Sequence, residues 1–172
     1  MKGVIPICLK ELVSQKFGQS KWEEIAQHSG VSLKILLPVQ DVTDDDTMKI
    51  FQTTSKVLNL SQNKVIDMFG NYWATVYAPR MYRLYFTGSK NSKELLLKMD
   101  SIHVTMTQRM AGSTPPRFNY NWLNDKTLIM TYFSQRNLVD IAIACIKGIG
   151  EYYKETLQVS CNSSNEIKIV FP

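Results

Sequence analysis

The spacing of apolar residues first changes along this chain at a break marked by Pro115-Pro116. Before the break, apolar side chains recur at intervals of three and four, which is the period of an α-helix. After it, Phe118, Tyr120 and Trp122 alternate with polar residues, which is the period of a β-strand. Because consecutive prolines cannot continue a helix, the pattern predicts an α+β fold. We expect a helical N-terminal part, then an antiparallel β-sheet packed on long helices.

The predicted elements follow from where these periods begin and end. Helices are expected over residues 3–17, 20–28, 44–58, 61–76, 91–110 and 138–153, and strands over 117–122, 128–133, 157–161 and 167–171, with a polar turn at 162–165. Asn91, with Glu94 three residues later, is a capping-box start for the fifth helix. Gly70 lies inside the fourth helix and is expected to permit close packing.

Composition narrows the class of protein. A length of 172 residues suits one domain with its own core. The net charge of +5 is spread along the chain, so we expect no nucleic-acid partner. Cys8, Cys145 and Cys161 are too scattered for a disulfide framework or a zinc site, which favours reduced thiols in the cytoplasm. Lys10 and Glu11 interrupt the first apolar run, and no run suits a membrane span, so we expect no membrane contact.

The two histidines differ in setting. His28 lies in the last turn of a short predicted helix, where a solvated cation is favourable. His103 lies on a helical stripe that includes Met99 and Met106, which predicts a buried, soft, apolar face. An imidazole there is either a core histidine satisfied by a hydrogen bond or a metal ligand. One histidine cannot close a structural zinc site, but it can be the axial ligand of a haem iron.

Tyr132, Ser134 and Arg136 follow one another at intervals of two, where a predicted strand ends. Side chains two apart in a strand point to the same face. Two hydroxyls and a guanidinium on one face suit carboxylates such as haem propionates, which need donors when they are buried. The alternative is an ordinary strand end with polar side chains.

The order of these features resembles the H-NOX (haem-nitric oxide/oxygen binding) family, which is related to the haem domain of soluble guanylate cyclase. A lone histidine on a helix is followed by residues 114–117 (Thr-Pro-Pro-Arg) and then by Tyr-x-Ser-x-Arg at 132–136. The resemblance begins at residues 1–3 (Met-Lys-Gly), includes 69–73 (Phe-Gly-Asn-Tyr-Trp) and extends to 148–150 (Gly-Ile-Gly). It therefore covers most of the chain.

The resemblance implies an H-NOX-like fold and a role for each residue of the pattern. Residues 1–172 would form one haem-binding sensor domain, with a helical N-terminal subdomain at 1–60 and a haem-ligating α/β subdomain at 61–172. The cofactor would be haem b (iron protoporphyrin IX). The implied roles are His103 as the proximal iron ligand, Tyr132, Ser134 and Arg136 as propionate donors, Pro116 as the residue that presses on the porphyrin, and Asp44 as the partner of Arg136.

The residues expected on the side of the haem where a gas would bind, here called the gas side, differ from those of the oxygen-binding members of the family. Tyr132, Ser134 and Arg136 are here called the clamp. Oxygen-binding members carry a tyrosine five residues beyond the clamp arginine, where this chain has Ile141. Without a donor hydroxyl, dioxygen loses a stabilising hydrogen bond, whereas nitric oxide needs none. The implied ligands are thus nitric oxide and carbon monoxide at ferrous haem. Ile5, Trp73, Tyr77, Ile141 and Cys145 would line the gas side, with Cys145 as a packing thiol rather than a ligand.

The resemblance also implies how the signal leaves the domain. Nitric oxide is expected to weaken or break the iron–His103 bond, so that the haem relaxes against Pro116 and the helices around Ile5. With no further segment attached, we expect a monomer without enzyme activity that signals in trans to a histidine kinase or a cyclic-di-GMP enzyme.

Three other interpretations stay open. A haem peroxidase would need a distal acid–base group, for which neither histidine is available. A dioxygen sensor or carrier would keep a stable oxygen complex in air. An interaction module without a cofactor would use His103 as a core residue.

Overall fold

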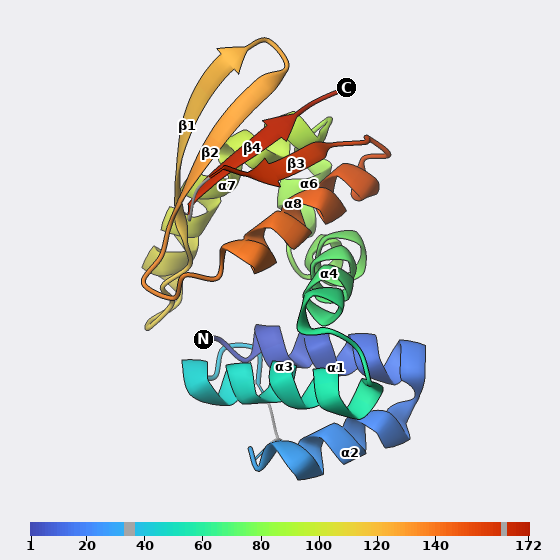
Figure 1. The fold of residues 1–172 in the computed structure, drawn as a ribbon. Coiled ribbons are helices and arrows are strands. Elements are labelled where there is room, and N and C mark those ends of the chain that lie inside the picture. Colours follow the sequence, from blue (N-terminus) through green and yellow to red (C-terminus); the bar gives the residue numbers. More distant parts are fainter. Residues whose placement is uncertain (33–36, 163–164) are drawn as a thin grey trace. The chain divides into compact units, whose positions relative to one another are not determined.

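The computed structural model describes residues 1–32, 37–162 and 165–172. Its chain contacts divide it into two compact units, Met1–Phe69 and Gly70–Pro172, here called the N-terminal and C-terminal units (Figure 1). The middle of the polar turn expected at 162–165 lies outside the described residues. The expectation of one sensor domain with a subdomain boundary after residue 60 stays a prediction. In the described part of the chain, no helix is both long and apolar enough to cross a bilayer.

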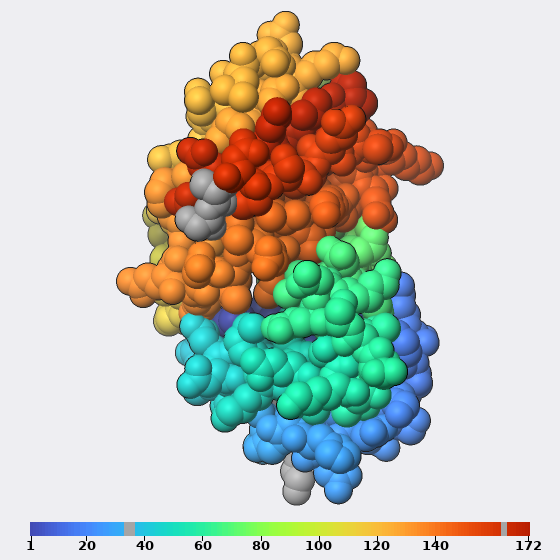
Figure 2. Space-filling model, viewed as in Figure 1, coloured from blue at the N-terminus to red at the C-terminus, as the bar shows by residue number. Residues whose placement is uncertain are grey.

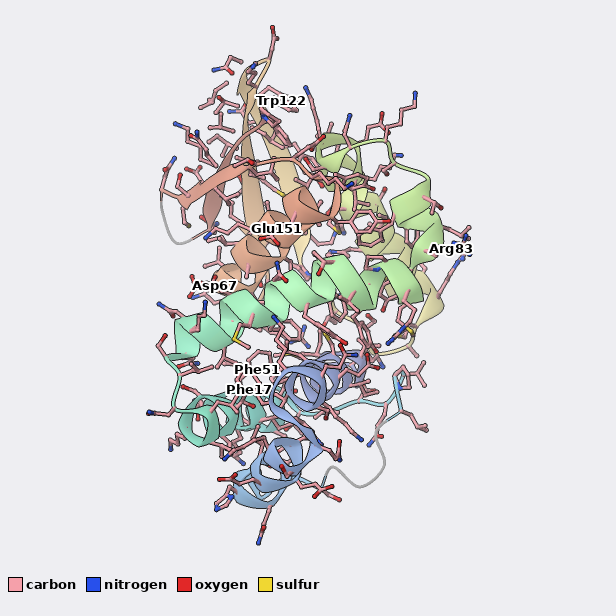
Figure 3. All side chains as sticks on the ribbon, turned by 90° about the vertical axis from the view of Figure 1, so that its right-hand side faces the viewer. Phe17, Phe51, Asp67, Arg83, Trp122 and Glu151 are labelled. Atoms are coloured by element: carbon pink, nitrogen blue, oxygen red, sulfur yellow. The ribbon has the colours of Figure 1, made fainter. Side chains whose placement is uncertain are left out.

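The N-terminal unit is helical, as its apolar period predicts. It contains α1 (Val4–Phe17), α2 (Gln19–Ser29), α3 (Asp44–Leu58) and most of α4 (Gln62–Tyr72). Thr43 caps α3, because its Oγ1 accepts a hydrogen bond of 3.0 Å from the Asp46 amide. Phe51, labelled in Figure 3, meets Phe69 edge to face with ring centroids 5.1 Å apart. These rings close a core in which the facing positions of all three first helices are buried.

The C-terminal unit pairs helices with one antiparallel sheet, which confirms the expected fold class. Its strands are β1 (Arg117–Asn124), β2 (Thr127–Phe133), β3 (Gln158–Cys161) and β4 (Glu166–Val170), in the order β1-β2-β4-β3. Its long helices are α7 (Ser92–Arg109) and α8 (Val139–Tyr152). One hydrophobic cluster joins both helices to alternate residues of the sheet. The helices therefore pack on a single sheet face. The tip of the β1–β2 hairpin stands out from the rest of this unit (Figure 2, yellow-orange).

One predicted helix ends differently from expectation. The helix expected over 61–76 is α-helical only to Tyr72, and the chain continues as the π-helical segment η1 (Trp73–Tyr77). The Ala78 amide donates to the Trp73 carbonyl, five residues back. Pro79 follows, which has no amide hydrogen for the next α-helical bond, so the widened turn accommodates the lost donor. Two short helices, α5 (Ala78–Met81) and α6 (Arg83–Thr87), then lead to α7.

Two glycines, Gly70 and Gly148, allow α8 to approach α4 and η1 closely. A Cβ on Gly70 would overlap the backbone and side chain of Ala144, and a Cβ on Gly148 would lie 2.8 Å from both the Ala74 Cβ and the Gly70 carbonyl oxygen. Only hydrogen atoms fit at these two positions. The expectation that Gly70 permits close packing is confirmed, and Gly148 supplies the matching surface on α8.

The N-terminus of α7 is capped nearly as predicted. Asn91 Oδ1 accepts a hydrogen bond of 2.8 Å from the Glu94 amide. The Glu94 carboxylate accepts in return from the Lys90 amide at 2.9 Å, one residue earlier than in a capping box. This cap fixes where α7 begins and so which of its faces meets the sheet. Leu95, Leu96 and Ile102 are buried on that face.

Candidate cofactor and gas site

His103 lies in the second half of α7, and a strand-side carbonyl orients its ring. Its Nδ1 lies 2.6 Å from the Pro116 carbonyl oxygen, so Nδ1 carries the proton and donates. The lone pair of the imidazole is then on Nε2, the atom that a metal ion would bind. Burial lowers the pKa of His103, which keeps the ring in the neutral form that ligation requires.

An ion pair that the sequence interpretation did not single out holds this arrangement together. Arg117 donates from Nε and Nη2 to the two carboxylate oxygens of Asp100, at 2.7 and 2.8 Å, and the Phe118 amide donates to Asp100 Oδ1 at 2.8 Å. The Arg117 guanidinium lowers the pKa of the Asp100 carboxyl. Asp100 precedes His103 by one turn and Arg117 follows Pro116, so the pair fastens the strand that carries the Pro116 carbonyl to the helix that carries His103.

Phe118 connects His103 to the predicted clamp. Its ring centroid lies 5.6 Å from that of His103 and 5.9 Å from that of Tyr132. The hairpin register pairs Phe118 with Tyr132, so both side chains point to the helix-covered face of the sheet. The structure thus brings the predicted histidine and the first clamp residue to the same region, although 29 positions separate them in the printed sequence.

The predicted clamp residues have the polarity that a carboxylate needs. The Tyr132 hydroxyl accepts from the Leu138 amide at 3.2 Å, and Ser134 Oγ accepts from the Arg136 amide at 3.2 Å. A hydroxyl that accepts from an amide still has its own proton to donate. Arg136 is held by its Nη1, which donates to the carbonyl and the hydroxyl of Thr114 at 2.6 and 2.8 Å. Two hydroxyl donors and one cation therefore gather where β2 ends, which fits a propionate.

The methionine stripe is less buried than predicted. Met99, His103, Met106 and Pro116 are half-buried, whereas the same helix fully buries Leu95 and Leu96. The expected buried, apolar face is found in part: Leu96, on the same stripe, is fully buried, and Met99 and Met106 are partly buried and pack against the hydrophobic cluster.

The predicted gas-side residues of the C-terminal unit lie on two elements that touch. Trp73 and Tyr77 belong to η1, and their rings stack at 5.3 Å. Ile141 and Cys145 lie four residues apart on α8, whose glycine crossing packs against η1. Burial raises the pKa of the Cys145 thiol to about 12, which makes it a packing group rather than an anionic ligand.

The remaining predicted residues lie on the N-terminal unit. Ile5 is half-buried on α1. Asp44, in the first turn of α3, accepts a hydrogen bond of 2.8 Å from the terminal ammonium of Met1. A pairing of Asp44 with Arg136 would link the two units and stays a prediction. His28 is exposed, with Nδ1 2.8 Å from the Glu24 carbonyl oxygen.

The donor set of the described residues suits a haem better than a bare metal ion. Among those residues, no group of three or more His, Cys, Asp or Glu side chains is placed to hold a metal. A haem iron needs only one protein ligand because the porphyrin supplies four nitrogens. A single neutral imidazole beside donors for carboxylates meets that requirement.

Comparisons with known proteins agree with this geometry. The Haem-NO-binding (HNOB) family profile matches residues 2–161. The soluble guanylate cyclase gcy-37 of Caenorhabditis elegans is 29% identical over 143 residues, which cover 79% of this chain and 20% of that protein. The chain thus spans about a fifth of the length of that relative.

Solved structures share the fold. An H-NOX protein from S. oneidensis in the Fe(II)NO ligation state superposes with a TM-score of 0.87 at 18% identity, covering 100% of this chain and 98% of that one. An oxygen-binding H-NOX domain related to soluble guanylate cyclases gives 0.83 at 22% identity, covering 99% and 95%. The profile match extends over nearly the whole sequence and the fold agrees from end to end. The chain therefore belongs to the haem-NO-binding family.

Proposed function

We propose that this chain is a haem-based sensor of nitric oxide, with carbon monoxide as a second ligand, and that it binds haem b through His103. The hydrogen bond from His103 Nδ1 to the Pro116 carbonyl carries the proposal, because it presents Nε2 as a neutral ligand in a fixed orientation. When bound, the haem would supply a ferrous iron that binds diatomic gases. The chain itself supplies the axial ligand, the clamp and the walls of the gas side.

The clamp residues would hold the propionates. Tyr132 and Ser134 would each donate a hydroxyl proton, and the Arg136 guanidinium would neutralise carboxylate charge. Pro116 would press on the porphyrin, because its own carbonyl is tied to the His103 ring. A movement of His103 would therefore pull on Pro116 and on the start of β1.

Ile141 supports nitric oxide as the preferred gas. Its alkyl side chain offers no hydrogen bond to a polar dioxygen ligand, and it lies one turn from Cys145 on the face of α8 that packs against η1. Nitric oxide does not depend on such a donor. The second candidate, a dioxygen sensor, is favoured by Trp73 and Tyr77, whose indole and phenol groups lie on the neighbouring η1.

We further propose that the chain acts as a sensor rather than an enzyme, and that it regulates a separate signalling protein, a histidine kinase or a cyclic-di-GMP enzyme. Family membership supports the sensor role. A ligand changes a partner's activity only through different affinities for two conformations of the sensor. The units at Met1–Phe69 and Gly70–Pro172 are the natural candidates for parts that change relative position.

Electronic spectra of the haem-reconstituted ferrous protein test this function. We expect a five-coordinate ferrous spectrum, binding of nitric oxide and carbon monoxide, and no stable complex in air. A stable oxygen complex would replace the ligand assignment with the dioxygen alternative. Failure to take up haem at all would leave an interaction module without a cofactor.

A further inference from the structure

A set of exposed apolar side chains lies on η1, α5 and α6, at residues that the proposed site does not use. The exposed fractions are 40% for Val76, 43% for Met81 and 85% for Leu84. Leucine at 85% exposure makes almost no contact with its own unit, and burying such a side chain against a partner would strengthen binding by roughly tenfold or more. Together with Arg80 and Arg83, these three residues are here called the α5–α6 patch.

The three elements of this patch carry charge of one sign. From residue 73 to residue 87 the charged residues are Arg80 and Arg83, and both are cationic. Arg80 lies with its guanidinium carbon 5.3 Å from the Tyr77 ring centroid, and the Arg83 side chain points away from the unit (Figure 3). An apolar centre with cations on its rim is complementary to a surface that carries apolar groups flanked by carboxylates.

The hairpin tip offers an instructive contrast within the same unit. Trp122 and Leu123 are also exposed, at 37% and 56%. There, however, the Lys93 ammonium already lies 4.3 Å from the Trp122 ring centroid and donates to the Asp125 carbonyl at 3.2 Å. The tip therefore has an intramolecular cation over its largest apolar side chain. Figure 3 shows Trp122 and Arg83 well apart.

A chain of ring contacts connects the patch to the proposed gas side. Arg80 covers Tyr77, and Tyr77 stacks on Trp73 at 5.3 Å. Both aromatic residues belong to the π-helical segment η1, and segments of this kind often occur at functional sites.

We propose that the α5–α6 patch is the docking surface for the signalling partner, and that it receives an amphipathic helix of that partner with leucine-like side chains on one face and carboxylates beside them. The proposal rests on the proposed sensor function for its biological meaning. Its physical content is separate, because binding at the patch depends on Leu84 and the two arginines rather than on haem.

The test uses fluorescence anisotropy with three labelled amphipathic peptides of about 18 residues. All three carry leucine on one face, and the other face carries Glu, Gln or Lys. The full haem-loaded chain is compared with Leu84→Ser and Arg83→Glu, and with matched controls Leu123→Ser and Lys126→Glu on the hairpin. We expect the Glu peptide to bind best and the two patch variants to weaken it by about tenfold or more. The controls should bind as the parent chain does.

Reversing the charge at Arg83 tests whether peptide binding depends on charge at the patch. Arg83→Glu should gain affinity for the Lys peptide while it loses affinity for the Glu peptide. Equal binding of all three peptides, or patch variants that bind like the controls, would overturn the proposal. So would patch-dependent binding to phosphatidylserine vesicles in place of peptide, because that outcome assigns the surface to a membrane.

The outcomes separate this proposal from the proposed function. Haem uptake and gas spectra report on the sensor function and do not involve Leu84 or Arg83. If the spectra fail while charge-specific peptide binding persists, the docking surface stands and the sensor function falls. If both hold, nitric oxide should change the dissociation constant of the Glu peptide for the ferrous chain by several-fold.

Discussion

The α7–β1 junction and the α8–η1 crossing are built on opposite principles. At the junction, charged and polar groups fix the position of His103: the Asp100–Arg117 pair, the Phe118 amide and the Pro116 carbonyl. At the crossing, Gly70 and Gly148 bring the helix backbones into close contact, and an exposed hydrogen bond from Asn71 to Glu151 lies beside them. Both regions belong to the C-terminal unit, and both contribute residues to the proposed haem site.

In the proposed haem site, this difference would fix the orientation of the axial imidazole by hydrogen bonds while apolar packing shapes the gas side. Directed hydrogen bonds define the orientation of an imidazole, because their energy depends on angle and distance. Close apolar packing defines only volume. Substitutions in the two regions should therefore have different effects. Those at the α7–β1 junction should change haem ligation, and those at the α8–η1 crossing should disrupt packing.

The largest expected effect is on haem retention. His103→Gly should remove most of the bound haem during purification, since it deletes the proposed axial ligand, and added imidazole should restore the Soret band. His28→Gly is the matched control, because His28 is exposed on α2. Retention of haem by His103→Gly without imidazole would exclude the axial role.

The next largest effect should come from filling the glycine crossing. Gly148→Leu places side-chain atoms where Ala74 and the Gly70 carbonyl already lie, and should lower the free energy of unfolding by about 3 kcal/mol. Lys147→Leu, one residue away and exposed on α8, should change it little. Urea titrations measure both, and equal stabilities for the two variants would show that the crossing is not tightly packed.

The junction should respond to pH as well as to substitution. Asp100→Asn should cost about 1–2 kcal/mol of unfolding free energy, discounted because the carboxylate is partly exposed. Arg117 holds the Asp100 pKa below the ordinary carboxyl value. The ion pair therefore stabilises the fold fully at pH values above the ordinary carboxyl pKa. This stabilisation is lost as the pH falls through the lowered pKa of Asp100 in the folded chain. Melting curves of parent and variant should converge as pH is lowered below the ordinary carboxyl pKa and through the lowered one. A difference in melting temperature between parent and variant that does not change with pH would show that the Asp100 charge is not the source of the stabilisation.

The smallest effect should appear on the gas side. Ile141→Tyr adds one hydroxyl donor to α8 and should strengthen dioxygen binding by about 1 kcal/mol, or roughly fivefold in affinity. Ile141→Phe has the same ring without the hydroxyl and should give no such gain. Oxygen dissociation rates of the two ferrous variants provide the comparison. Identical rates would mean that residue 141 does not face the ligand.

The polar residues of the candidate site could be predicted from the sequence more easily than their arrangement in space. His103 and the Tyr132–Arg136 run are visible as isolated polar residues in apolar periods. Apart from the helix expected over 61–76 and the unpredicted α5 and α6, the helices and strands fall within a few residues of their expected bounds. Asp100 was missed because a charged residue on a helix usually faces solvent. Only the hairpin, which brings Arg117 back beside α7, gives it a partner. A signal was present in the spacing, since Asp100 precedes His103 by one turn and Arg117 follows Pro116.

Features that depend on long-range contact were harder to predict. The η1 segment follows from Pro79 together with the α8 crossing, and periodicity alone does not distinguish a π turn from an α turn. The half-buried methionine face follows from which side of α7 the sheet covers, and the apolar period marks both sides alike.

The most direct test of the account is the iron–imidazole stretching band in the resonance Raman spectrum of the ferrous protein. Samples are compared with natural and with ¹⁵N-labelled histidine. If His103 binds the iron, labelling should lower the frequency of this band in the parent chain. His103→Gly supplied with unlabelled imidazole should show no label-dependent shift, although His28 is still labelled. A band that ignores the label in the parent chain, or that still shifts in His103→Gly, would show that His103 does not bind the iron.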